Sequence, residues 1–331
     1  MSINELEATI RDIAVRGRGI LAADESTPTC KKRFDSIGVE STEENRQAYR
    51  DMLFTAPDIE KYISGVILFD ETLRQKSLSG VPFPKLLADK NIVPGIKVDL
   101  GVKALPFSDD ESYTQGMDNL PERLQEYKQL GARFAKWRAV LHISDCYPSC
   151  AAMTANAEGL ANYAAVCQAN GIVPIVEPEL LMDGDHTIER CAEATEHMLH
   201  RVFDRLFHHN VILEAMILKP SMVISGKDCK QQAAVEVVAE STLRVLRRTV
   251  PAAVPTINFL SGGQSDTVAT AHLAAMNQSA IQKPWNLSFS YGRALQAPAL
   301  KEWSGKAENV KSAQKKFIER AKANSEASIP A

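Results

Sequence analysis

Short apolar runs recur along the chain, and each run ends in polar residues or in glycine or proline. Apolar runs of this length that are bounded by turn residues are typical of strands buried on both faces. The pattern predicts eight strands, at residues 19–26, 65–71, 93–99, 134–140, 172–179, 212–220, 256–263 and 286–292.

Segments with helical spacing of apolar residues separate the predicted strands. Residues 120–134, 158–171 and 231–249 are examples, with Pro121 suited to a first helical turn and Gly171 to a helix end. Strands that alternate with helices predict parallel βαβ units. Eight such units in about 270 residues favour an α/β fold of the closed (β/α)8 type, a TIM barrel. No GxGxxG motif follows the first strand, which disfavours an open dinucleotide-binding sheet.

Two helical extensions flank the eight predicted units. Residues 1–18 have the pattern of an amphipathic helix ahead of the barrel, and residues 305–327 that of a basic helix. A C-terminal helix with a short polar tail therefore occupies residues 305–331. Because no linker or low-complexity tract interrupts the chain, we expect residues 1–331 to form a single domain.

Composition and charge exclude several classes of partner. The 331 residues are 45% hydrophobic and 24% charged, with a formal net charge of −3, which is ordinary for a globular protein. This balance predicts no nucleic-acid partner and no membrane partner. The N-terminal residues mix acids and bases without a signal-like apolar core, and no apolar run is long enough to cross a bilayer. The predicted location is cytoplasmic.

The cysteines and histidines show no metal-binding spacing. The chain has no CxxC, HxH or HExxH motif, so we expect neither a metal nor another cofactor. Reduced, mostly buried thiols are expected for the six cysteines Cys30, Cys146, Cys150, Cys167, Cys191 and Cys229.

Charged residues cluster where the predicted strands end, which is where barrels of this type place their chemistry. They are Asp24, Glu25, Asp70, Glu71, Lys97, Asp99, Lys136, Arg138, Glu177, Glu179 and Lys219. Three of the pairs are two residues apart, so both side chains of each pair project to the same face of a strand. A structural network of ion pairs is one explanation. The number of charges among apolar neighbours favours an active site rich in ions instead.

Lys219 is the most informative of these residues. It ends an apolar run, and Pro220 favours extended backbone at the lysine. A buried amine close to a second cation such as Lys136 loses its proton more easily, and a neutral amine attacks carbonyl carbons to form a Schiff base. An ordinary ion pair with Glu177 or Glu179 explains the same residues, and the sequence pattern leaves both interpretations open.

Two glycine-containing loops indicate a phosphate site. "LSGGQS" at 260–265 and "SYGRA" at 290–294 follow the last two predicted strands, where barrels often bind phosphate through backbone N–H groups. Lys97 and Arg138, with Ser26, are candidates for a second anion site. Two separate sites fit a substrate with phosphate at both ends.

Eight short motifs together give the sequence a clear resemblance to a known family. They are "LAADES", "GVILF", "GIKVD", "FAKWR", "VPIVEPE", "ILKPSM", "FLSGGQS" and "SFSYGRALQ". The set resembles class I fructose-bisphosphate aldolase, in order and from about residue 15 to residue 325. The resemblance implies a metal-independent barrel enzyme of glycolysis and gluconeogenesis that acts as a homotetramer on a phosphorylated sugar.

The resemblance also implies roles for individual residues. Lys219 matches the lysine that forms the Schiff base, Glu177 the general acid/base and Glu179 its companion. Lys136 matches the cation near the carbinolamine, and Asp24 the carboxylate at the C4 hydroxyl. The ketone-end phosphate is matched by Ser261, Gly262, Gly292 and Arg293, and the other phosphate by Ser26, Arg33, Lys97 and Arg138.

The sequence departs from the family pattern at two places. Members often end in a tail with a C-terminal tyrosine that aids proton exchange on the enamine, whereas the last tyrosine here is Tyr291. Either the natural protein is shorter or the chain is truncated. If the tail is truly absent, slower enamine protonation is expected while cleavage survives. Pro28 and Thr29 replace a common Gly-Ser, which predicts a stiffer loop.

Several alternatives to fructose 1,6-bisphosphate cleavage stay open at this stage. Fructose 1-phosphate and sedoheptulose 1,7-bisphosphate are alternative substrates, and the sequence does not rank the three. A phosphosugar isomerase with a glutamate base, or an inactive barrel scaffold, are further alternatives.

Overall fold

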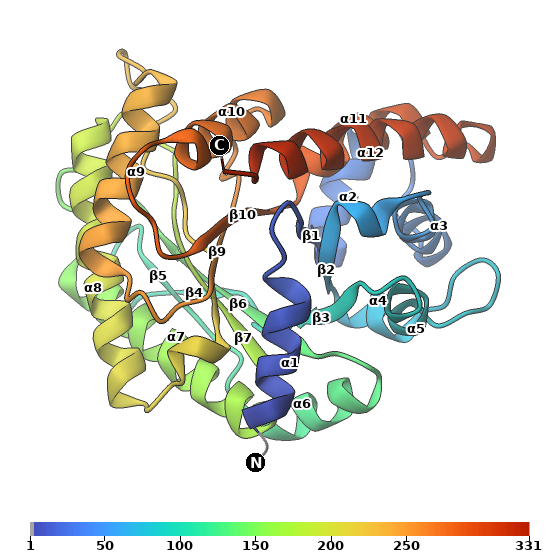
Figure 1. Ribbon diagram of the computed structural model, residues 1–331, viewed down its shortest axis with the longest axis horizontal. Helices are drawn as coiled ribbons and strands as arrows, with labels where there is room; N and C mark the ends of the chain where they lie inside the picture. Colours follow the sequence, from blue (N-terminus) through green and yellow to red (C-terminus); the bar gives the residue numbers. More distant parts are fainter. Residues whose placement is uncertain (1–2, 331) are drawn as a thin grey trace.

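The computed structural model describes residues 3–330, and its central feature is a closed barrel of parallel strands (Figure 1). The order around the ring is β1, β10, β9, β8, β7, β6, β3 and β2. The strands are β1 (Gly19–Ala23), β2 (Ile63–Leu68), β3 (Val93–Lys97), β6 (Phe134–Leu141), β7 (Val173–Leu180), β8 (Ile217–Leu218), β9 (Thr256–Phe259) and β10 (Asn286–Tyr291). The predicted (β/α)8 barrel is confirmed, with the strands in the predicted sequence order.

Helices surround the barrel on all sides visible in Figure 1, with α7, α8 and α9 to the left and α2 to α5 to the right. The helices are α1 (Ile3–Ile13), α2 (Thr27–Asp35), α3 (Glu43–Phe54), α4 (Asp70–Arg74), α5 (Phe83–Ala88), α6 (Leu120–Gln129), α7 (Cys150–Ala169), α8 (Ile188–His208), α9 (Val235–Thr249), α10 (Asp266–Gln278), α11 (Arg293–Trp303) and α12 (Val310–Ala327). Both predicted terminal helices are confirmed, as α1 and α12. No helix within residues 3–330 has the length and apolar character of a membrane span.

The N-terminal helix closes one end of the barrel. The apolar face of α1 carries Leu6, Ile10 and Ile13, which are buried in one cluster with Phe134 and Ile217 from inside the strands. Helical spacing places these apolar α1 residues on one face, so the helix seals the barrel floor. The functional side chains therefore lie at the opposite end, where the strands finish.

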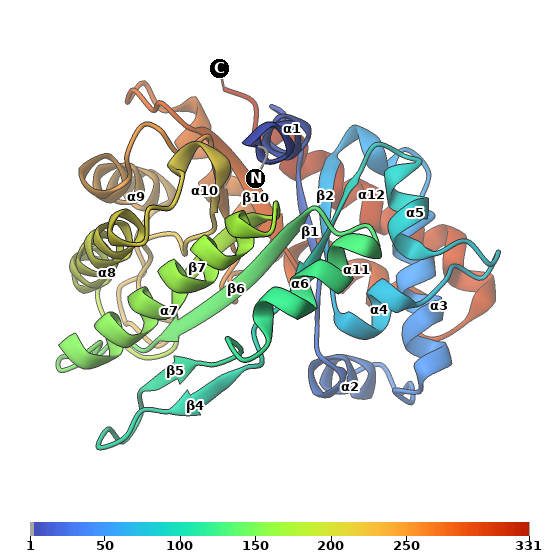
Figure 2. The same ribbon diagram turned by 90° about the horizontal axis from the view of Figure 1, so that it is seen from below.

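Three details of the predicted elements are wrong. The strand expected at 212–220 is only two residues long, because Leu213–Ala215 form a 3₁₀ turn before β8. Asp70 and Glu71 do not extend β2; they begin α4, and Glu71 pairs with Arg46 outside the barrel mouth. A hairpin of β4 (Val102–Ala104) and β5 (Ser112–Thr114) was not expected, and it projects from the barrel in Figure 2.

The barrel floor depends on a strand glycine that lies against an aromatic ring. A Cβ added at Gly95 would lie 2.3 Å from the ring of Phe134, which is fully buried. We expect Gly95→Ala to destabilise the fold by about 1–3 kcal/mol, because a packed ring must move. The measurement is the free energy of unfolding in urea.

Gly159 provides the matched control for that substitution. It lies within α7, and a Cβ there would meet no atom within 4 Å. Gly159→Ala should therefore stabilise the protein by about 0.5–1 kcal/mol, because alanine favours helix. Equal effects of the two substitutions would contradict the packing described for Phe134.

Candidate active site

All thirteen residues predicted to act on the substrate line one cavity of about 380 Å³. The cavity lies at the C-terminal ends of the strands, so residues far apart in the sequence meet there. In chain order they are Asp24, Ser26, Arg33, Lys97, Lys136, Arg138, Glu177, Glu179, Lys219, Ser261, Gly262, Gly292 and Arg293. The spacing of two along β6 and β7 works as expected, since both members of each pair reach the cavity.

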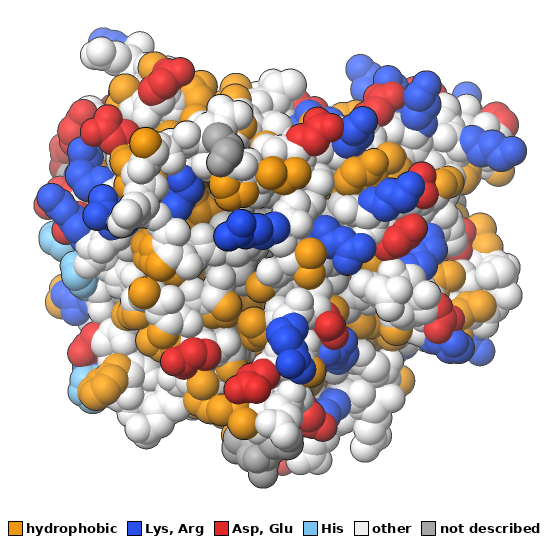
Figure 3. Space-filling view, in the orientation of Figure 1, with side chains coloured by type: hydrophobic (Ala, Val, Ile, Leu, Met, Phe, Trp, Pro, Cys, Tyr) orange, Lys and Arg blue, Asp and Glu red, His pale blue; other side chains and the backbone are white. Residues whose placement is uncertain are grey.

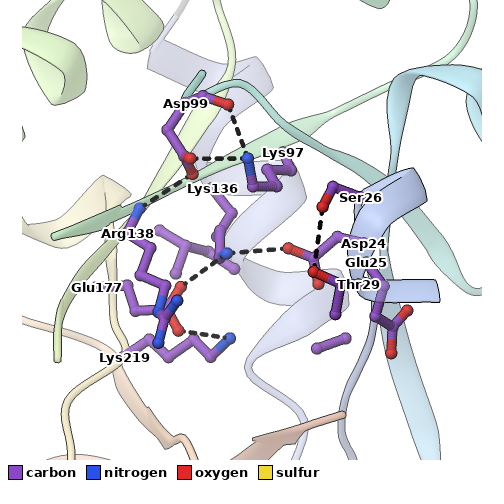
Figure 4. A network of polar contacts seen from close by, with 12 residues as sticks. Asp24, Glu25, Ser26, Thr29, Lys97, Asp99, Lys136, Arg138, Glu177 and Lys219 are labelled. Atoms are coloured by element: carbon purple, nitrogen blue, oxygen red, sulfur yellow. Dashed lines mark hydrogen bonds and ion pairs between the residues drawn. The ribbon is translucent and has the colours of Figure 1, made fainter. Parts of the chain in front are cut away.

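Four charged residues form a chain of ion pairs at the centre of the cavity (Figure 4). Lys136 Nζ lies 2.9 Å from Asp24 Oδ2 and 3.2 Å from Glu177 Oε2. Lys219 Nζ lies 3.0 Å from Glu177 Oε1. Two cations therefore alternate with two carboxylates, and Glu177 is shared between the two lysines.

The central chain is nearly closed to solvent. Lys219 and Glu177 are each 3% exposed, and Lys136 is 4% exposed. Ion pairs at such depth are weakly screened, so each charge depends strongly on its partner. Lys219 does form an ion pair, with Glu177 as the partner rather than Glu179. It is compatible with a nucleophilic role, because Glu177 Oε1 is within reach of a proton on Lys219.

Burial and neighbouring charge act in opposite directions on the central groups. Burial raises the pKa of Asp24, but the ammonium groups of Lys136 and Lys219 outweigh burial and hold that pKa well below its usual value. Burial lowers the pKa of Lys136, but the carboxylates of Asp24 and Glu177 outweigh burial and raise that pKa above its usual value. Asp24 is therefore a carboxylate near neutral pH, and Lys136 is an ammonium.

A second set of pairs surrounds the central chain. Lys97 Nζ lies 2.7 Å from Asp99 Oδ1, and the Arg138 guanidinium pairs with the Glu179 carboxylate. Asp99 also accepts from the backbone N–H of Arg138 at 3.3 Å. Lys97 and Arg138 thus already hold carboxylates, so an anion between them must compete with Asp99 and Glu179.

The two glycine-containing loops converge on one side of the cavity. Gly262 and Gly263 both have positive φ, at 55° and 87°, and they lead into α10, whose N-cap is Ser265. Gly292 precedes α11, which begins at Arg293. A Cβ at Gly263 would lie 3.3 Å from Arg293 Nη2, so the two loops are in contact. Free N–H groups at two helix starts and a guanidinium suit a phosphate.

The loop after β1 leads almost directly into α2. Pro28 lies in the first turn of α2, so the loop is short, and Ser26 Oγ lies 3.1 Å from Thr29 Oγ1. The Ser26 hydroxyl does not cap α2. Arg33, later in the same helix, pairs with Glu25.

Some cavity residues received no role from the sequence. Glu25 and Asp99 stood out only as charges at strand ends, and Thr29 only as a departure from a motif. Ser290 Oγ is buried beside the cavity with no hydrogen-bond partner among the described residues. Ser290 precedes Tyr291, whose side chain packs outside the barrel against α10. Because side chains alternate along a strand, this position places Ser290 on the inward face, and that alternation could have identified it.

Tyr291 and the cysteines lie apart from this chemistry. Tyr291 is buried, its hydroxyl donates to the Ala269 carbonyl at 3.1 Å, and burial raises its pKa. It therefore cannot act as a mobile tail tyrosine. The expectation of mostly buried thiols is only half correct: Cys30, Cys167 and Cys191 are buried, Cys229 is partly buried, and Cys146 and Cys150 are exposed because they lie in and after the β6–α7 loop.

A buried lysine paired with a carboxylate, in a cavity at the C-terminal ends of the strands of a (β/α)8 barrel, is an arrangement typical of enzymes that act on carbonyl compounds. The family model described as "Glycolytic: Fructose-bisphosphate aldolase class-I" matches residues 5–331. The chain belongs to this family, the class I, metal-independent fructose-bisphosphate aldolases of glycolysis.

Relatives support the assignment over nearly the whole chain. A probable fructose-bisphosphate aldolase class 1 of Xanthomonas campestris pv. campestris is 55% identical, over 99% of this chain and 98% of that protein. A cytosolic fructose-bisphosphate aldolase of Arabidopsis thaliana is 54% identical, over 98% and 83%. The solved structure of the Plasmodium falciparum fructose-bisphosphate aldolase, in complex with TRAP and a small-molecule inhibitor, superposes with a TM-score of 0.96 at 51% identity, over 98% and 94%.

Proposed function

We propose that the chain cleaves fructose 1,6-bisphosphate reversibly to dihydroxyacetone phosphate and glyceraldehyde 3-phosphate, with Lys219 as the Schiff-base lysine. The observation that carries this proposal is the chain of ion pairs from Asp24 through Lys136 and Glu177 to Lys219. It supplies an amine and two carboxylates in one cavity.

The reaction begins at Lys219. Its Nζ transfers a proton to Glu177, 3.0 Å away, and the neutral amine attacks the C2 carbonyl of the ketose. The resulting carbinolamine loses its hydroxyl as water, with Glu177 donating the proton, and a protonated imine remains. Lys136 keeps the charge of the site balanced while Glu177 changes protonation, since it contacts the same carboxylate.

Cleavage uses Asp24. Its carboxylate accepts the proton of the C4 hydroxyl, the electrons form a carbonyl at C4, and the C3–C4 bond breaks. The protonated imine accepts the pair of electrons from that bond and becomes an enamine on Lys219. Glyceraldehyde 3-phosphate leaves, the enamine is protonated at C3, and hydrolysis of the imine releases dihydroxyacetone phosphate.

The phosphate groups position the substrate for these steps. Ser261, Gly262, Gly292 and Arg293 bind the phosphate on the ketone side. Ser26, Arg33, Lys97 and Arg138 bind the other phosphate. Lys97 and Arg138 exchange their carboxylate partners for it, while Arg33 keeps its pair with Glu25. Because this second set consists of three cations and a hydroxyl, we propose that the bisphosphate is preferred over fructose 1-phosphate.

A turnover assay tests the proposed activity. Cleavage of fructose 1,6-bisphosphate, followed through both triose phosphates, should proceed unchanged in EDTA, because a Schiff base needs no metal. The value of kcat/KM should be higher for this substrate than for fructose 1-phosphate, with sedoheptulose 1,7-bisphosphate as the bisphosphate control. Loss of turnover in EDTA would contradict the mechanism, and a preference for fructose 1-phosphate would contradict the second phosphate site.

We further propose that the enzyme is a homotetramer and acts in the cytosol. Leu100, Val102 and Phe107, on and beside the β4–β5 hairpin, are 59%, 50% and 110% exposed, which supports burial in an interface between subunits. Light scattering should give four times 36.4 kDa, and a monomeric mass would refute the tetramer.

Acids and bases are mixed on the face drawn in Figure 3, which fits the expectation of no nucleic-acid or membrane partner.

A further inference from the structure

A buried polar network lies behind the active-site cavity, and the mechanism above does not use it. The carboxylate of Glu25 pairs with Arg33 and lies 2.6 Å from Arg50 Nη2. Gln296 Nε2 donates to Glu25 Oε1 at 3.1 Å. Arg50 is 2% exposed and Gln296 is 1% exposed. A cation and an amide buried this deeply are costly unless their partners are fixed.

The network links three elements that build the site. Arg50 comes from α3, Glu25 from the loop after β1, and Gln296 from the first turn of α11. Gln296 Nε2 also donates to the Ala22 carbonyl at 2.7 Å. Ala22 lies two residues before Asp24, and Gln296 lies three residues after Arg293. One amide group therefore sets the position of the β1 end relative to the helix that carries the phosphate-binding arginine.

The neighbouring groups fix which way the Gln296 amide points. The Tyr49 hydroxyl donates to Gln296 Oε1 at 3.0 Å. The Ala22 carbonyl and the Glu25 carboxylate can only accept, so the NH₂ group must face them, and Oε1 is left to accept from Tyr49. The orientation of the amide is thus determined by its surroundings.

The network also separates two adjacent carboxylates. Asp24 and Glu25 lie directly after β1, and their side chains reach different partners. Asp24 meets Lys136 inside the barrel, whereas Glu25 meets Arg50 and Arg33 outside it. Burial raises the pKa of Glu25, but the two arginines outweigh burial and lower it, so Glu25 keeps its charge. A charged Glu25 can hold Arg33 at the cavity edge.

We propose that Arg50, Glu25 and Gln296 form a positioning network that holds Asp24 and Arg33 in the geometry required for carbon–carbon cleavage. The inference rests on the role proposed above for Asp24. Schiff-base formation depends on Lys219 and Glu177, which β8 and β7 position, so it should not depend on this network. Cleavage and Schiff-base formation are therefore separable.

Gln296→Met tests the proposal, because methionine fills a similar volume but cannot donate to Ala22 or Glu25. We expect kcat for fructose 1,6-bisphosphate cleavage to fall by about 10- to 100-fold, as for other displacements of a reacting group by less than about 1 Å. The fraction of enzyme trapped by dihydroxyacetone phosphate and borohydride should stay within about twofold of wild type.

Gln314→Met is the matched control. Gln314 Nε2 also makes two donations, to the Met52 carbonyl and to Thr55 Oγ1, both at 3.0 Å, but between α12 and α3 and away from the cavity. We expect this variant to lose stability while both cleavage and trapping stay near wild type. The unfolding midpoint of each variant is measured first, and the activity assays are then run under conditions in which both variants are folded.

The outcomes separate this inference from the proposed function. Equal losses of cleavage and trapping in Gln296→Met, or unchanged cleavage, would overturn the positioning role. Should that variant fail to fold, Arg50→Lys keeps the buried charge with a shorter reach and is expected to show the same split. A wild-type protein that neither cleaves nor becomes trapped would instead refute the function of the site itself.

Discussion

Lys219→Met is expected to lower kcat for fructose 1,6-bisphosphate cleavage by at least about 10⁴-fold, as removal of a covalent nucleophile does in other enzymes. Methionine keeps the length and apolar stem of the lysine, which is 3% exposed, but provides no amine. The measurement is steady-state turnover with both triose phosphates quantified.

Lys97→Met is the control for loss of a cavity cation. Lys97 lines the same cavity but pairs with Asp99, away from Glu177. The Lys97→Met substitution should raise KM for the bisphosphate more than it lowers kcat, because it removes a phosphate ligand and not a reacting group. A Lys219→Met enzyme with near wild-type kcat would contradict the assignment of the nucleophile.

Lys136→Met is expected to lower both activity and stability. Lys136 lies between Asp24 and Glu177, and its loss brings two buried carboxylates together with no cation between them. Breaking a buried pair in this way costs about 3–5 kcal/mol of folding free energy. We expect kcat to fall by about 10²- to 10⁴-fold, since both acid–base groups are disturbed.

The same substitution should change the pH dependence in a defined direction. The folded pKa of Asp24 is lowered, so its charge stabilises the wild-type fold above the usual carboxyl pKa, and this stability is lost as pH falls through the lowered value. Without Lys136, less positive charge opposes the effect of burial on Asp24, so the pKa of this carboxyl group rises. The acid limb of the pH–rate profile for cleavage should therefore shift to higher pH.

Lys128→Met serves as the control for charge removal. Lys128 pairs with Glu5 at 2.8 Å on the surface, where both side chains are largely exposed. Exposed pairs contribute little to stability, so this variant should unfold and titrate like wild type. A similar loss of stability in Lys128→Met and Lys136→Met would contradict the importance of the buried ion chain.

The architecture could be predicted because its signals are local. Buried strands and amphipathic helices each have their own periodicity, and their alternation defines a parallel barrel. The errors occur where the local signal is weak. The run at 212–220 is apolar throughout, yet residues 213–215 form a turn, and β4 and β5 are three-residue strands on the surface.

The charged residues of the site on β6 and β7 could be predicted for a related reason. A charge every second residue along β6 and β7 identifies which side chains face the barrel interior, whatever their partners. The partners themselves depend on the order of strands around the ring and on the depth of each side chain. The sequence therefore left Lys219 open to Glu177 or Glu179, and only the structure pairs Glu179 with Arg138.

The network behind the cavity was beyond prediction. Glu25 was visible as a charge at a strand end, but its partners Arg50 and Gln296 lie on helices 25 and 271 residues away. On α3 and α11 these two residues have no periodic feature that separates a buried polar side chain from an exposed one. Long-range packing alone brings them to β1.

The most direct test of the account is to incubate the protein with dihydroxyacetone phosphate and borohydride and then identify the modified peptide by mass spectrometry. Borohydride reduces the imine to a stable secondary amine, so the adduct marks the lysine that formed it. The account predicts a single adduct, on Lys219, that is absent from Lys219→Met and unchanged in Lys97→Met. An adduct on another lysine, or no adduct in an enzyme that cleaves the bisphosphate, would contradict the Schiff-base role of Lys219.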